Sequence, residues 1–448
     1  QKQVPLTEGP ILKSLTGLAV PIMISSFLGT LYNITDMAWI GLLGSKAVAA
    51  VGVGGMYVWL SQGLASLARM GGQVHVAQCL GRGDKEQAHR YAKTAVQLSI
   101  LLGLAFAAVS LLFTDPLVTF FKLEGVKTIL DAKIYMRITC GLILFSFLNL
   151  TLTGLYTAQG DSKTPFVANF IGLLINLLLD PLLILGVGPF PRIEVAGAAV
   201  ATVSAQLVVM LVMMVGVFRS KKEENVLKGI RLFEPFSKEE LGNICKIGGP
   251  TAIQGMVYCM ISMVLTRMVA AFGAEAIATQ RVGGQIESVS WNTADGFAAA
   301  LNAFVGQNYG AKKMDRVQKG YRISFWTVAI WGALIMLAFI IFPGPIAGVF
   351  FHEEKAMEIA ISYLIIIGFS EAFMCVELMT IGALSGLGKT KLCSVISITA
   401  TSMRIPLAMV LSRTSLGLDG IWWALTLTSV AKGIIFYLTF RYQMREKC

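Results

Sequence analysis

Two stretches decide the fold of this chain: PIMISSFLGTLYNITDMAWIGLLG at residues 21–44 and PTAIQGMVYCMISMVLTRMVAAFG at residues 250–273. Each is a mostly apolar run that begins at a proline and ends at a glycine. A helix rises about 1.5 Å per residue and the hydrocarbon layer of a bilayer is about 30 Å thick, so roughly 20 such residues cross it. Both stretches therefore predict membrane-spanning helices.

The composition extends this prediction to the whole chain. Of its 448 residues, 55% are hydrophobic and only 14% are charged, with a mean hydropathy of +0.69. Several water-soluble domains would need more polar surface than this chain can supply. We expect an all-α integral membrane protein with twelve transmembrane helices, near residues 15–40, 47–78, 92–112, 130–158, 164–187, 196–218, 247–271, 276–308, 322–347, 358–386, 391–412 and 418–440.

The two opening stretches also belong to an internal repeat. Pro21, Gly44, Gly55, Gln78 and Gly81 recur 229 residues later as Pro250, Gly273, Gly284, Gln307 and Gly310. Six spans in each half return the chain to its starting side, so the halves share one orientation and their pseudo-twofold axis runs along the membrane normal. We predict two six-helix bundles around a central cavity: an N-lobe (1–218), a cytoplasmic linker (219–246) and a C-lobe (247–448). Such repeats are typical of transporters, although some channels and membrane enzymes are also built by duplication.

The net charge of +11 comes from Lys and Arg residues in the connecting loops. They are not gathered on one face, so we expect no nucleic-acid partner. By the positive-inside rule, the loops that carry them are cytoplasmic. We therefore expect a multi-pass protein of the cell (inner) membrane with both termini in the cytoplasm. We recognise no cleavable signal peptide before the first span and expect that span to direct insertion. The seven cysteines lack metal-ligand spacing and paired extracellular positions, so we predict neither disulfides nor a structural metal.

Two acids lie where charge is costly. Asp36 follows Tyr32 by four residues in the first span, and Asp180 follows Asn176 by four in the fifth, so each pair shares a helix face. A carboxylate inside a span is a functional hypothesis by default, and one that gains and loses a proton can couple proton flow to transport. Asp36 could instead lie at the membrane interface, and Asp180, which precedes a proline, could cap or kink a helix. The repeat position of Asp36 is Leu265, which argues against an architectural role.

The second half carries its own acids. Glu287 and Asp295 lie two helical turns apart in the eighth span, and Glu371 and Glu377 lie in the tenth. We predict that Glu287, Asp295 and Glu377 line the substrate cavity together with Gln254. Internal salt bridges with basic residues in the spans would explain these acids equally well.

Four short stretches resemble a known family: GDSKTP at residues 160–165, NLLLDPLLI at 176–184, GAAVAT at 197–202 and VGQNYGA at 305–311. In this order and spacing they resemble the multidrug and toxic compound extrusion (MATE) transporters, particularly their prokaryotic DinF-like and MepA-like branches. The resemblance covers nearly the whole chain. It implies two lobes, alternating access, and antiport of drugs against protons or sodium ions, with no cofactor.

The resemblance also implies where the coupling ion binds. Matched residue by residue, the N-lobe cation site falls on Asp36, Asn176, Asp180 and Thr202, with Tyr32 and Tyr135 nearby. H⁺ or Na⁺ would bind there, Na⁺ at Asp36, Asp180 and Asn176. Members of the NorM type also carry acids in the seventh and tenth spans, whereas here the seventh span has none and the tenth-span acids lie in another register.

These observations favour a cation-coupled antiporter, acting as a monomer in the lipid bilayer, that exports small amphipathic and cationic organic compounds by rocker-type alternating access. A flippase for a lipid-linked precursor would share the architecture but would need a strongly basic cavity, against which the intramembrane acids argue. A membrane-embedded transferase would need paired aspartates for a metal or a histidine beside an acid near the interface, and the three histidines lack such partners. A channel would need a filter or a ring of pore charges, and no stretch resembles one.

Overall fold

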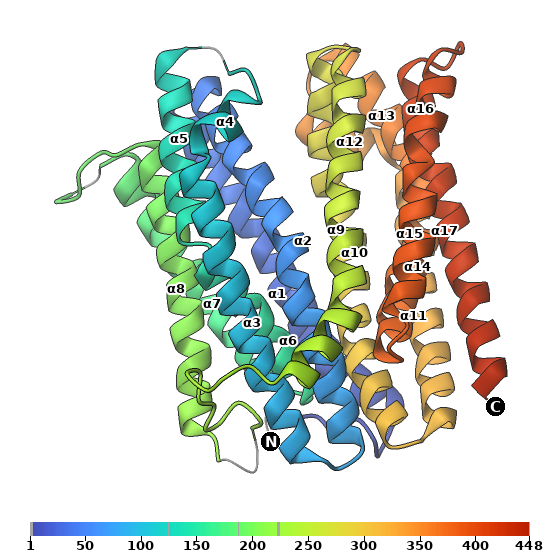
Figure 1. The fold of residues 1–448 in the computed structure, drawn as a ribbon. Helices are drawn as coiled ribbons and strands as arrows, with labels where there is room; N and C mark the ends of the chain where they lie inside the picture. The colour runs from blue at the N-terminus through green and yellow to red at the C-terminus, as the bar shows by residue number, and fades with distance from the viewer. Residues whose placement is uncertain (1–2, 124, 187, 222–224, 448) are drawn as a thin grey trace. The chain divides into compact units, whose positions relative to one another are not determined.

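The computed structural model describes residues 3–123, 125–186, 188–221 and 225–447, and it is helical throughout these ranges, without strands (Figure 1). The first half contains α1 (Ile11–Gly41), α2 (Ser45–Gly81), α3 (Lys85–Leu112), α4 (Thr114–Thr119), α5 (Val126–Gly141), α6 (Leu144–Ala158), α7 (Lys163–Ile184) and α8 (Val195–Arg219). The second half contains α9 (Lys238–Ala270), α10 (Ala274–Gly310), α11 (Met314–Ile341), α12 (Pro343–Phe350), α13 (Glu354–Gly368), α14 (Glu371–Gly386), α15 (Thr390–Ser402), α16 (Arg404–Ser412) and α17 (Leu418–Lys447).

These helices account for the twelve expected spans. Within the described ranges, nine helical segments are long and apolar enough to cross a membrane, and the bent pairs α5–α6 and α13–α14 bring the number to eleven. The twelfth, α10, has 37 residues but does not pass the same test of apolarity. Its polar character comes from side chains that include Glu287 and Asp295. The chain is thus a multi-pass helical membrane protein.

Three of the spans expected to be continuous are broken. The bends are 42° between α5 and α6 and 51° between α13 and α14, and each follows a glycine, Gly141 or Gly368. Glycine is the poorest helix former after proline. The break between α15 and α16 at Met403 has a different cause, because Pro406 has no N–H to donate to the carbonyl of Ser402.

The chain divides into two compact units. Unit 1 comprises Gln1–Val4 and Ile24–Gly255, and unit 2 comprises Pro5–Met23 and Met256–Cys448. The boundaries fall inside α1 and α9, whereas the expected lobes meet at the linker 219–246. Each of these two helices therefore begins in one unit and continues into the other.

The repeat seen in the sequence is present in the backbone and the packing. Gly44 precedes α2 with φ 111° and ψ 170°, and Gly273 precedes α10 with φ 110° and ψ 175°, a conformation that favours glycine. In unit 1, α2 packs against α3, α5 and α6, and in unit 2, α10 packs against α11, α13 and α14. The two units therefore repeat one helix arrangement.

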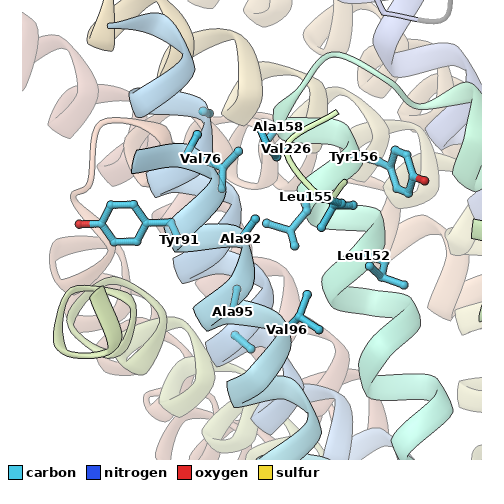
Figure 2. Packing of buried hydrophobic residues seen from close by; sticks show 14 of the residues in the cluster. Val76, Tyr91, Ala92, Ala95, Val96, Leu152, Leu155, Tyr156, Ala158 and Val226 are labelled. Atoms are coloured by element: carbon cyan, nitrogen blue, oxygen red, sulfur yellow. The ribbon is translucent and has the colours of Figure 1, made fainter. Parts of the chain in front are cut away.

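Small residues let the helices of unit 1 approach closely. Figure 2 shows Ala92 and Ala95 of α3 beside Leu155 of α6, in a buried cluster that also contains Val226 of the linker. Lipid tails are as apolar as these side chains, so association rests on tight packing rather than on a hydrophobic effect. Val226 packs the linker onto this core.

Candidate cation site and intramembrane charges

In unit 1, α1 and α7 bring two carboxyl groups to one amide. Nδ2 of Asn176 donates to Oδ1 of Asp36 at 2.8 Å and lies 3.2 Å from Oδ2 of Asp180. The two carboxyl groups also interact as a hydrogen-bonding pair. Asn176 and Asp180 have no exposed surface. Since a carboxylate only accepts hydrogen bonds, the pair needs a proton or another cation between its oxygens.

Two further helices complete this cluster. The phenol of Tyr32, one turn before Asp36 on α1, hydrogen-bonds the side chain of Thr202 on α8 and lies within electrostatic range of both carboxyl groups. Tyr135 of α5 lies within the same range of Asp36 and Asp180. The structure thus places all six residues of the expected coupling site together, from four helices of one unit.

The oxygen atoms of the cluster suit a proton or a hard cation. Oδ1 of Asn176 and Oδ1 of Asp180 are buried without a hydrogen-bond partner, and burying such an oxygen is unfavourable unless something binds it. Hard cations take carboxylate, amide and hydroxyl oxygens as ligands. In the described chain, neither carboxyl group forms an ion pair with a lysine or arginine. A positive charge would therefore complete the cluster.

Asp180 does not cap a helix end. It lies inside α7, which continues through Pro181 to Ile184. Pro181 has no N–H to donate to the carbonyl of Leu177, one turn earlier. The hydrogen bonds of the Asp180 side chain are made to Asn176 and Asp36 rather than to backbone N–H groups.

Unit 2 contains a second pair of hydrogen-bonded carboxyl groups. Glu287 of α10 hydrogen-bonds Glu371 of α14 and the phenol of Tyr363 on α13. Ser290, one turn after Glu287, donates to Oε2 of Glu371. Glu371 is fully buried, and its Oε1 has no partner. Here too one of the two acids must carry a proton.

The remaining buried charges of unit 2 surround Tyr258 of α9. Nζ of Lys432 lies 3.1 Å from Oε1 of Glu377, and both side chains are less than a tenth exposed. Arg404 donates to the hydroxyls of Thr428 at 2.8 Å and Ser429 at 2.9 Å. The charged groups of Arg404 and Lys432 each lie 5.6 Å from the centre of the Tyr258 ring.

The expected substrate-cavity residues do not form one group. Glu287 and Asp295 both lie within electrostatic range of Cys375, so they face the same part of unit 2. Glu377 is held by Lys432, which is the internal salt bridge considered as the alternative. Gln254 belongs to unit 1.

Sequence reasoning missed three residues of these networks: Lys432, Tyr258 and Ser290. Lys432 could have been found, because it is the one charge in the apolar stretch from Gly420 to Phe440. Tyr258 and Ser290 gave no such signal, since hydroxyl groups are common in spans.

Comparison with known families bears on the duplication directly. The MatE family model matches the chain twice, at residues 21–182 and 250–410. The starts of the two matches are separated by the same 229 residues that separate the repeated glycines and prolines. This chain belongs to the MatE family. A MatE protein is a membrane transporter rather than an enzyme, and the relatives are named accordingly.

Three curated relatives show the range of the family around this chain. The probable multidrug resistance protein NorM of Thermotoga maritima is 29% identical, over 99% of this chain and 96% of its own. The multidrug export protein MepA of Staphylococcus haemolyticus is 23% identical, over 93% and 90%. A protein of Shewanella oneidensis named as an FAD transporter is 25% identical, over 96% and 95%.

Solved structures share the fold from end to end. A MATE transporter in a straight conformation superposes with a TM-score of 0.90 at 24% identity, covering 100% of this chain and 99% of its own. A MOP-superfamily transporter from Pyrococcus furiosus, described as having a binding pocket of reversed polarity, superposes with a TM-score of 0.89 at 25% identity, over 99% and 98%. The likeness in fold therefore extends over nearly all of this chain.

Proposed function

We propose that this MatE transporter is an antiporter that exports small amphipathic, cationic organic compounds in exchange for H⁺ or Na⁺. The observation that carries the proposal is the contact of Asp36, Asn176 and Asp180 in unit 1. Two acids and an amide without a basic partner form a site that a cation completes. The names of the multidrug relatives support the substrate class.

Exchange requires that binding of the compound weakens binding of the cation, and the reverse. In its inward-open state the protein binds the compound, and the lobes 1–218 and 247–448 then rock outward. A cation next loads the Asp36–Asp180 pair and favours release and return. This negative coupling between the two sites makes the exchange obligatory.

The first helix offers a physical link for this coupling. Asp36 lies on the part of α1 in unit 1, whereas Ala19 and Met23 of the same helix belong to unit 2. There they pack so closely on Gly296 of α10 that an added Cβ would lie 2.3 Å from Cγ of Met23. A change at Asp36 that shifts α1 would therefore alter the packing of α1 against Gly296 in unit 2, because packed helices do not deform freely.

Efflux from liposomes tests the proposal. The purified protein is reconstituted, and efflux of a fluorescent organic cation is followed under an imposed pH gradient and then a sodium gradient. We expect one of the gradients to drive transport. In Asp36→Asn and in Asp180→Asn, the rate of this gradient-driven efflux should fall by about 5–150-fold. If neither gradient drives efflux, in the parent or in the variants, the proposal is contradicted.

An anionic substrate is the second candidate. Arg404 places a buried positive charge beside Tyr258 and is bound by neutral hydroxyl groups at hydrogen-bond distance, whereas the nearby Lys432 is paired with Glu377. One relative is named as an FAD transporter. Adding flavin adenine dinucleotide to the liposome panel separates the candidates, because a cation exporter would leave it untransported.

The proposal includes a topology. The loop that joins α8 to α9 holds Lys221, Lys228 and Arg231, and further basic residues lie in or beside the loops that join α2 to α3 and α10 to α11. By the positive-inside rule this places them, the linker 219–246 and both termini in the cytoplasm of a cell whose inner membrane holds the protein. One chain carries all residues of the cluster, so we infer that a monomer transports, without a nucleic-acid partner.

A further inference from the structure

The linker between α8 and α9 carries an exposed ridge of three apolar side chains and one arginine. The ridge consists of Arg231, Leu232, Phe233 and Phe236, in a segment without regular structure. Phe233 is 105% exposed, Leu232 is 43% exposed and Phe236 is 40% exposed. A fully exposed phenylalanine on a loop that faces water is unfavourable unless another phase or molecule takes it up.

The ridge is held in place rather than free. Nε2 of Gln97 on α3 donates to the carbonyls of Leu232 at 3.0 Å and Glu234 at 2.8 Å. Nζ of Lys93, one turn earlier on α3, lies 2.8 Å from Oε2 of Glu234. The backbone on both sides of Phe233 is thus bound to α3, and its ring projects from a fixed position.

This position coincides with the level at which α3 becomes apolar. Charged side chains occur on α3 from Lys85 to Lys93, and none follows from residue 94 to 112. Gln97 is twelve residues from the start of α3, roughly 18 Å along the helix. The linker therefore runs along α3 down to the edge of its membrane-spanning part.

A second helix of unit 1 contacts the linker at the end of its own apolar run. The apolar run of α8 ends at Phe218, directly before Arg219. Nζ of Lys228 in the linker donates to the carbonyl of Phe218 at 2.6 Å and lies 5.7 Å from the centre of its ring. The linker meets α8, like α3, where charged residues give way to apolar ones.

We propose that the ridge lies in the bilayer interface and binds anionic phospholipids: Leu232, Phe233 and Phe236 among the upper acyl chains, and Arg231 on the phosphate groups. The Arg231 side chain is 83% exposed and lies 3.9 Å from Glu234, which Lys93 already neutralises. Aromatic rings and arginines are the side chains that anchor proteins at this depth. The anchor ties unit 1 to the membrane surface, independently of what the protein transports.

Spin labelling measures the depth of the ridge. Phe233→Cys and, as a control, Glu239→Cys at the exposed start of α9 are made in a Cys245→Ser, Cys448→Ser background, because the other five cysteines are buried. Each nitroxide-labelled protein is reconstituted in vesicles that contain phosphatidylglycerol, and its collision rates with oxygen and with a water-soluble nickel chelate are recorded. We expect residue 233 to favour oxygen several-fold over residue 239.

Two outcomes would overturn the proposal. If the label at residue 233 collides with the nickel chelate as often as the label at residue 239, the ridge lies in water. A soluble protein would then be the expected partner. In the second arm, Arg231→Gln and vesicles of pure phosphatidylcholine should each make the label at 233 shallower. If the depth of the label at residue 233 is the same after both changes, the ridge does not bind anionic headgroups.

Discussion

Asn176 and Asp36 stand 140 residues apart in the sequence, yet Nδ2 of the amide lies 2.8 Å from Oδ1 of the carboxyl group. The same nitrogen reaches Asp180. One amide therefore holds two acids in a single site, and the geometry of that site depends on α1 and α7 together.

Removing this amide should impair coupling more than folding. In Asn176→Leu, both acids lose a buried donor, which destabilises the ionised cluster by about 1–3 kcal/mol and disturbs the balance between loading and release of the cation. Gradient-driven efflux from liposomes measures the loss. Asn169→Leu, two turns earlier on α7, makes the same change outside the cluster and should leave efflux near the parent level. Equal losses in the two variants would assign the effect to α7 packing.

Two glycines test the packing of Tyr135 on α5 and Tyr363 on α13. A Cβ at Gly54 would lie 2.3 Å from the Tyr135 ring, and a Cβ at Gly283 would lie 2.2 Å from the Tyr363 ring. Gly54→Ala and Gly283→Ala should therefore cost about 1–3 kcal/mol through overpacking and lower the thermal midpoint. Gly55→Ala and Gly284→Ala enter open space and serve as controls. Unchanged midpoints for Gly54→Ala and Gly283→Ala would show that the tyrosines move aside freely.

Variants of the buried pair Lys432 and Glu377 distinguish a structural role of the pair from a role in substrate recognition. Glu377→Leu alone leaves a buried ammonium unpaired and should cost about 3–5 kcal/mol. Adding Lys432→Met replaces the pair by apolar groups and should return the thermal midpoint close to that of the parent. We expect efflux to return with it. A double variant that is stable but inactive would instead show that the pair takes part in transport.

The tether between the linker and α3 should depend on pH. The hydrogen bond and charge of Lys93 lower the pKa of Glu234 below the ordinary value of a glutamate. A lowered folded-state pKa means that the tether is fully formed above that ordinary value, about 4.3, and is lost as the pH falls through the lowered one. A spin label at residue 233 should become more mobile over that acidic range. Lys93→Gln should remove most of this change, and a mobility independent of pH in the parent would count against the tether.

The start of α1 should depend on Arg316. Its guanidinium donates to the carbonyls of Leu6 at 3.0 Å and Gly9 at 2.9 Å, all within unit 2. In Arg316→Met, these carbonyls lose charged donors, each worth about 1.5–3 kcal/mol. Hydrogen exchange of residues 6–20 should rise by at least about tenfold, whereas Arg322→Met on the outer face of α11 should leave it unchanged. Unaltered exchange in Arg316→Met would show that packing alone holds the segment.

The helical membrane class, the twelve spans and the duplication could be predicted from the residues alone, because apolar run length and a repeated register are properties of neighbouring residues. The sequence also indicated the pairs Tyr32–Asp36 and Asn176–Asp180, since residues four apart share a helix face. Thr202 and Tyr135 came from the family resemblance alone, and whether the six residues bind the coupling ion stays a prediction.

Which helices contact one another became known from the three-dimensional structure. The contact of Asn176 with Asp36, the pairing of Glu287 with Glu371, and the burial of Lys432 against Glu377 join residues from separate helices. The passage of α1 and α9 from one unit to the other likewise has no local signature. Periodicity fixes the face that a residue occupies on its own helix, whereas the partner of that face depends on the packing of the whole bundle.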